Sequence, residues 1–168
     1  HAHSSFAPVP VVVGNNEYWN GIIRTVKKGF PLIGSGRNRF QLVCLEDVVE
    51  AVRFCIGREE CYGETFLVAE DAAGAMTLEG IVNHIRKELG LAGGTKKIPG
   101  FLGGALAAAN SVLKFNPILK PAYLQRMLRE RSYSTAKLGA LGWKARHSAK
   151  EKLREIIMDF EKNSNTGI

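Results

Sequence analysis

Residues 29–57 constrain the fold most, because the spacing of their apolar side chains changes from that of a strand to that of a helix. Pro31–Ile33 and Phe40–Leu45 are short apolar runs, and each predicts a strand. Gly34 and Gly36 lie between the two runs and predict a turn. We therefore expect a glycine turn that leads into a buried strand.

A helix is predicted directly after the second run. Asp47 and Glu50 form the D-x-x-E pattern of a capping box, so Asp47 is expected to be an N-cap rather than an acid catalyst. Gly57 is expected to end this helix, because glycine readily adopts the left-handed backbone conformation found after a helix C-terminus. Apolar residues at helical spacing are expected to form the buried face of this helix: Val48, Val49, Val52, Cys55 and Ile56.

The composition fits one globular domain. The chain has 168 residues, of which 45% are hydrophobic, and a formal net charge of +7. This charge fits either an anionic partner or a basic surface that keeps the protein in solution. We expect residues 1–8 to be an added or disordered lead, residues 9–163 to form the domain, and residues 164–168 to be a frayed tail.

The cysteines and the apolar segments indicate where in the cell the protein is expected. Cys44, Cys55 and Cys61 show neither C-x-x-C nor metal-ligand spacing, so we expect free thiols and a cytoplasmic protein. We expect no secretory signal, because residues 1–10 lack its charged start and apolar core. Residues 101–113 are too short and too interrupted to span a membrane. They predict a packed helix or, alternatively, a lid over an apolar ligand.

The order of motifs in residues 29–57 resembles that of the extended short-chain dehydrogenase/reductases. These form the NAD(P)-dependent epimerase/dehydratase family, which includes sugar-nucleotide epimerases and flavonol-type reductases. The resemblance rests on a G-x-G turn, a basic segment, an apolar strand, an acidic pair and a V-x-E-A-V helix. Cys44 stands where the family usually has His or Tyr, and Glu46 and Asp47 stand for the acidic pair.

The resemblance continues toward both ends of the chain. Val9–Val13 predicts a buried strand that ends in V-V-G-N, which is similar to the family's V-Y-G-P. Tyr133–Trp143 resembles the family's late D-x-S-K-A and L-G-W segment. Helices are predicted to start at Asn16, at Thr77 and at Ser148, in addition to the one at Asp47.

Only the second half of the family pattern is present. No G-x-x-G-x-x-G turn precedes Val9, and no Ser followed by Y-x-x-x-K does. The resemblance therefore implies an α/β fold: the C-terminal portion of a Rossmann-like NAD(P)-binding fold with its small substrate-binding subdomain. We expect few short, mainly parallel strands with flanking helices.

Two segments imitate catalytic or cofactor motifs. Tyr133 and Lys137 are spaced as Y-x-x-x-K, but the cap residues between them predict that the helix starts after Tyr133. Gly100 and Gly103 imitate a phosphate turn, but no buried strand precedes them, so we interpret them as a helix start. We therefore predict no catalytic residue and no cofactor-binding residue in this chain.

Two histidines are not expected to bind a metal. His84 is predicted to be solvated at the polar edge of its helix, and His147 precedes a helix cap in a basic loop. Neither has a partner at metal-ligand spacing. Cys44 is interpreted as a small core residue rather than a nucleophile, since no base lies near it in the sequence.

Arginines beside the glycine turn are the main candidates for substrate binding. A guanidinium can hold a phosphate by two parallel hydrogen bonds, although a solvated loop arginine is an equal alternative. The resemblance implies that an arginine near this turn contacts a pyrophosphate. The substrate-binding candidates are Asn15, Asn16, Arg37, Arg39, Arg126 and Arg131.

The resemblance implies the substrate-binding part of an NAD(P)-dependent epimerase, dehydratase or reductase that acts on a nucleotide sugar. The catalytic Tyr and Lys and the NAD or NADP site would lie in a missing N-terminal half, so the sequence does not decide whether this chain is an enzyme by itself. One alternative is part of a flavonol-reductase-like or steroid-dehydrogenase-like oxidoreductase on an apolar carbonyl substrate. Another is a stand-alone binding module. The expected partners are an anionic small molecule, the missing half and a possible second copy, without nucleic acid or membrane.

The chain alone is expected not to bind NAD or NADP tightly, because it lacks the glycine turn that cradles a pyrophosphate. Calorimetric titration with either dinucleotide measures this directly. A stoichiometric site of micromolar affinity would contradict the interpretation as a C-terminal part.

Overall fold

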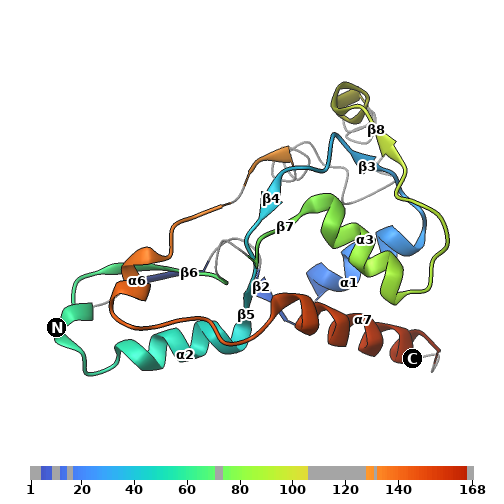
Figure 1. Cartoon of the computed structure of the whole chain (residues 1–168). Coiled ribbons are helices and arrows are strands. Elements are labelled where there is room, and N and C mark those ends of the chain that lie inside the picture. The colour runs from blue at the N-terminus through green and yellow to red at the C-terminus, as the bar shows by residue number, and fades with distance from the viewer. Residues whose placement is uncertain are drawn as a thin grey trace.

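A computed structural model describes residues 5–8, 12–14, 17–70, 74–105, 128–130 and 132–165. The strands are short: β1 (Ser5–Pro8), β2 (Val12–Val13), β3 (Leu32–Ile33), β4 (Arg39–Phe40), β5 (Val43–Cys44), β6 (Thr65–Val68), β7 (Met76–Thr77) and β8 (Lys97–Ile98). The helices are α1 (Glu17–Lys27), α2 (Leu45–Cys55), α3 (Leu78–Glu88), α6 (Ala136–Ala140) and α7 (Ala149–Asn165), with a 3-10 turn η1 (Glu59–Cys61). The predicted α/β class is confirmed (Figure 1).

The described strands pair two by two, mostly in parallel. β1 pairs with β6, β2 with β5, and β3 with β8 in parallel, whereas β4 and β7 are antiparallel. β1 begins within the segment that the sequence predicted to be a lead, because Ser5 is already in register with Thr65. The expectation that residues 1–8 lie outside the fold is therefore wrong for Ser5–Pro8.

The predicted strand Phe40–Leu45 is broken in the middle. β4 pairs with β7 and β5 pairs with β2, and the backbone between them turns from one neighbour to the other. Leu42 accepts a hydrogen bond from the Glu70 N–H at 2.9 Å instead of continuing either ladder. The apolar run could not reveal this break, because both halves are buried.

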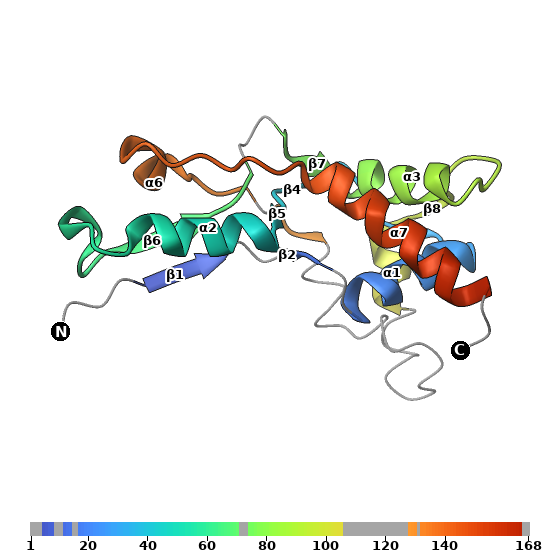
Figure 2. The same ribbon diagram turned by 90° about the horizontal axis from the view of Figure 1, so that it is seen from below.

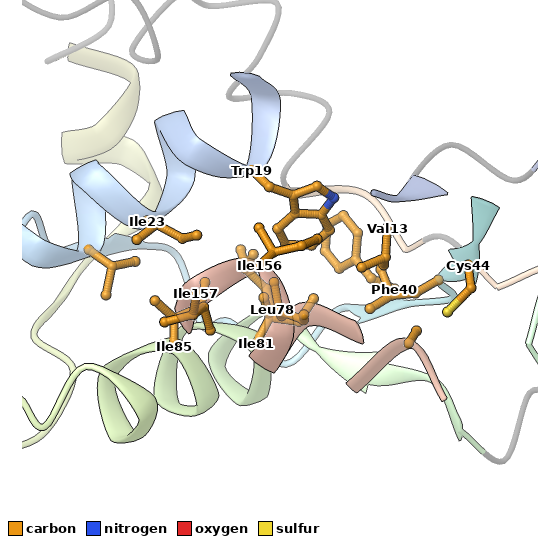
Figure 3. Packing of buried hydrophobic residues seen from close by; sticks show 14 of the residues in the cluster. Val13, Trp19, Ile23, Phe40, Cys44, Leu78, Ile81, Ile85, Ile156 and Ile157 are labelled. Carbon is orange, nitrogen blue, oxygen red and sulfur yellow. The ribbon is translucent and has the colours of Figure 1, made fainter. Parts of the chain in front are cut away.

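The buried side chains of the described residues form two hydrophobic clusters, and Figure 2 shows the elements of each grouped at one end of the molecule. The first joins α1, α3 and α7, where Trp19 and Ile23 face Ile156 and Ile157 (Figure 3). The second joins α2, β6 and α6. Its buried members are Val43, Ala51, Cys55, Cys61, Phe66, Val68, Ala69, Leu138 and Trp143.

Helix α2 differs from its prediction at its start and in its buried face. It begins at Leu45, so Asp47 lies inside the first turn and is not the N-cap. Its buried side chains are Asp47, Ala51 and Cys55. We call a row of exposed apolar residues the α2 stripe: Leu45, Val49 and Val52 on the helix, and Ile56, which is its C-cap residue.

The predicted caps of two other helices are confirmed. The Thr77 hydroxyl accepts a hydrogen bond from Gly80 N–H at 2.9 Å, and Ser148 Oγ accepts one from Glu151 N–H at 3.4 Å. His84, expected in solvent, is only 8% exposed, and its Nε2 lies 3.1 Å from the Lys150 carbonyl oxygen. It therefore links α3 to α7, a contact between segments distant in sequence.

Residues 100–105 are helical, which agrees with the predicted helix start, and residues 106–113 of that prediction lie outside the described residues. Gly103 is buried against Ile33 of β3, and a Cβ at this position would overlap the isoleucine side chain. The glycine that imitates a phosphate turn is thus required for close packing. None of the described helices is long and apolar enough to cross a membrane.

Gly103→Ala should lower the free energy of unfolding by about 1–3 kcal/mol, because the added methyl group has no room beside Ile33. Urea unfolding measures the change. Gly104→Ala is the matched control: nothing lies within 4 Å of its Cβ position, so it should be neutral or stabilising by up to about 1 kcal/mol. An equal cost in the Ile33→Ala background would contradict the packing argument.

Candidate anion-binding site

The glycine turn before β4 is held rigidly by neighbouring elements. Gly34 and Gly36 have φ angles of 84° and 68°, which a side chain rarely adopts. The Gly36 carbonyl accepts the Glu79 N–H at 3.0 Å, and the Asn38 carbonyl accepts the Leu78 N–H at 3.0 Å. The first turn of α3 therefore fixes the backbone that carries the candidate arginines.

Arg37 and Arg39 are both exposed on this turn. Toward the described residues, neither guanidinium makes an ion pair or hydrogen bond. Lys97, by contrast, is neutralised by Glu79 at 2.7 Å. The turn thus presents two cationic groups on a fixed backbone that pair with no acid among the residues described, because Glu79 of α3 is already paired with Lys97.

A third arginine, which the sequence analysis did not single out, lies beside the same turn. Leu128 lies against Gly34, where a Cβ would approach its Cδ2 atom to 2.8 Å. Asn38 Nδ2 donates to the Arg129 carbonyl oxygen at 3.4 Å. Arg129 is exposed, so three arginines of the described residues belong to one small region. The basic run from residue 120 to residue 154 was the only sequence signal for it.

The other predicted binding residues are not placed. Asn15, Asn16, Arg126 and Arg131 lie outside the described residues. Their roles therefore remain predictions from the sequence.

The structure shows the surroundings of Tyr133 and Lys137, the pair that is spaced as Y-x-x-x-K. Tyr133 lies before α6, as the sequence predicted. Lys137 forms an ion pair with Glu64, donates to the Thr65 carbonyl oxygen at 3.3 Å and lies 5.3 Å from the ring centroid of Phe66. Its ammonium group therefore fastens α6 to β6.

A buried carboxylate joins α2 to the loop before α7. Asp47 Oδ1 accepts the Arg146 N–H at 3.0 Å and lies 2.8 Å from His147 Nδ1, and Oδ2 accepts the His147 N–H at 3.2 Å. Asp47 is 1% exposed. Its predicted capping role is wrong, because the carboxylate satisfies donors that are about a hundred residues away in sequence.

Burial shifts the pKa of two acidic groups near Asp47. Burial, together with the negative charges of Asp47, Glu46 and Glu70, raises the pKa of the Cys44 thiol to about 12, so the thiol stays protonated at neutral pH. Burial also raises the pKa of Glu70, while a hydrogen bond from the Ala149 N–H opposes this shift. Within the described part of the chain, no three His, Cys, Asp or Glu side chains could hold a metal ion.

Solved structures of known enzymes share this fold. UDP-glucose 4-epimerase from Thermotoga maritima matches with a TM-score of 0.62 at 15% identity, over 95% of this chain and 46% of its own. UDP-glucuronic acid 4-epimerase from Bacillus cereus matches with a TM-score of 0.63 at 10% identity, over 94% and 44%. An epimerase from Methanothermobacter thermautotrophicus gives 0.66 at 11%, over 99% and 46%.

The resemblance to the NAD(P)-dependent epimerases and dehydratases is confirmed at the level of the fold. The chain spans less than half the length of these solved structures, which fits a C-terminal part. No protein-family model and no curated protein matches the sequence.

The Asp47 contact should make stability depend on pH. Its hydrogen bond and negative charge raise the pKa of His147 above the ordinary 6.5. The resulting stabilisation is fully present below the pKa of the unfolded chain and is lost as pH rises through the folded pKa. The parent and His147→Asn should therefore differ most in unfolding free energy below the ordinary histidine pKa of 6.5, and least once the pH exceeds the raised pKa of the folded state.

Asp47→Asn should bring the pKa of His147 back toward its ordinary value, followed by NMR titration of the ring. The same variant should lower the unfolding free energy by about 1–3 kcal/mol, since buried donors lose a charged acceptor. An unchanged His147 titration would show that the two groups do not interact in solution.

Proposed function

We propose that this chain is the substrate-binding part of an NAD(P)-dependent epimerase or dehydratase that acts on a nucleotide sugar. The observation that supports this best is a pair of exposed arginines, without an ion pair to any described residue, on a glycine turn fixed by α3. Among the solved structures with this fold are one bound to UDP-glucose and one bound to UDP-glucuronic acid and NAD.

The chemistry of the turn suits a diphosphate. A guanidinium holds phosphate oxygens in a bidentate fork and stays charged at every working pH. Because the turn is held at Gly36 and Asn38, little backbone entropy would be lost when Arg37 and Arg39 meet the ligand. The chain's own part in the reaction is to bind and orient the substrate. The hydride chemistry would come from NAD or NADP held by the other half of the enzyme.

The α2 stripe supports a partner for this chain. Ile56, the C-cap residue of α2, is 73% exposed, and Leu45, Val49 and Val52 are exposed on the helix itself. β1 and β6 form a two-stranded parallel sheet among the described residues, whereas parallel sheets are usually wider and covered on both faces. We propose that the nucleotide-binding part of the complete enzyme covers the α2 stripe; the solved structures with this fold are longer than this chain.

Arg39→Ala in the complete enzyme should raise the Michaelis constant for a nucleotide sugar by roughly ten- to a hundredfold, with a smaller effect on turnover. Loss of a charge-assisted contact costs about 1.5–3 kcal/mol, and a contact made equally in substrate and transition state acts mainly on the Michaelis constant. Steady-state kinetics measure both constants. Arg37→Ala, nearer the tip of the turn, should cost less.

Lys144→Ala is the matched control, because Lys144 is also exposed but belongs to the loop before α7. It removes the same unit of charge and should leave the Michaelis constant unchanged. Added salt should weaken substrate binding more in the parent than in Arg39→Ala. If Arg39→Ala has no effect, or if only neutral apolar carbonyl compounds are turned over, the nucleotide-sugar proposal fails in favour of a reductase.

A further inference from the structure

Gln41 is a fully buried polar side chain beside the arginine turn. It is 0% exposed and lies in the break between β4 and β5, two residues after Arg39. A buried amide costs stability unless its donors and acceptor find partners. Its contacts therefore indicate what this position holds together.

The two ends of the Gln41 amide reach two different segments. Nε2 donates to the Glu70 carbonyl oxygen at 3.0 Å, and Oε1 accepts the Tyr133 N–H at 2.7 Å. Only this orientation of the amide satisfies both partners, since a backbone N–H needs an acceptor and a carbonyl needs a donor. Gln41 thus ties the end of β6 to the backbone that follows Arg129.

A second amide holds the same backbone four residues earlier. Asn38 Nδ2 donates to the Arg129 carbonyl oxygen at 3.4 Å, and Leu128 packs over Gly34. We call Asn38 and Gln41 the amide clamp. Because the clamp contacts the chain at Arg129 and again at Tyr133, it fixes Arg129 relative to Arg37 and Arg39.

We propose that Gln41 is a positioning residue that makes Arg129 a third member of the anion site, with the diphosphate of a nucleotide sugar as the ligand class. The proposal rests on the function proposed above. Gln41 does not touch the ligand; it acts through the Tyr133 N–H, and its buried amide sets where the Arg129 segment lies. Arg39 does not depend on this contact, because α3 fixes its turn.

A double-mutant cycle on the complete enzyme tests the coupling, with the Michaelis constant for UDP-glucose as the readout. Arg129→Ala should raise this constant about tenfold in the parent and less than about twofold in the Gln41→Met background, where Arg129 is already misplaced. Arg39→Ala should have the same effect in both backgrounds. Equal effects of Arg129→Ala in the two backgrounds would overturn the proposal.

Hydrogen exchange on this chain gives a readout independent of substrate. Gln41→Met should abolish protection of the Tyr133 amide while the amides of α3 keep theirs. Unchanged Tyr133 protection would also overturn the proposal. If Gln41→Met does not fold, Asn38→Ala opens the other end of the clamp and should likewise reduce the effect of Arg129→Ala to less than about twofold.

The two proposals fail in different ways. If no arginine variant changes the Michaelis constant, the nucleotide-sugar function fails, whatever the exchange result. If Arg39→Ala and Arg129→Ala act independently of Gln41, the function stands and the positioning role is refuted.

Discussion

The structure depends on one buried carboxylate that receives donors from the far end of the chain. Asp47 leaves the first turn of α2 and accepts two backbone N–H groups at Arg146 and His147, together with the His147 ring. These contacts join the cluster around α2 and β6 to the cluster around α1, α3 and α7. A carboxylate suits this place because ionised acceptors make stronger hydrogen bonds, and an unpaired buried charge would be costly.

The same anchor explains which face of α2 is buried. Asp47 is directed toward the loop before α7, and Ala51 and Cys55 on the same face of α2 are buried in the second cluster. The larger side chains of Val49, Val52 and Ile56 are therefore exposed. A helix with branched apolar side chains in solvent is unusual for a domain that is complete by itself. This is the physical basis for placing a partner on the α2 stripe.

The candidate site combines rigidity with unbalanced charge. The nearby acid Glu79 is paired with Lys97, which leaves Arg37 and Arg39 without an internal counter-charge among the described residues. A rigid cationic turn suits an anion because neither ion pairs nor backbone entropy must be given up on binding. The buried amide of Gln41 joins a second segment, at Tyr133, to this turn. Because the amide is buried, a donor or acceptor left without a partner there would cost stability.

The sequence by itself determined the fold class, the family likeness and most helix positions, because these follow from local periodicity, caps and glycine stops. The helix caps Thr77 and Ser148 could be predicted in this way. Only the tertiary structure decided the roles of Asp47, Gln41 and Gly103, whose partners are distant in sequence. Short-range patterns record which residues can start a helix. They do not indicate which distant backbone group forms a hydrogen bond with a buried polar atom, because that pairing depends on how the elements pack together.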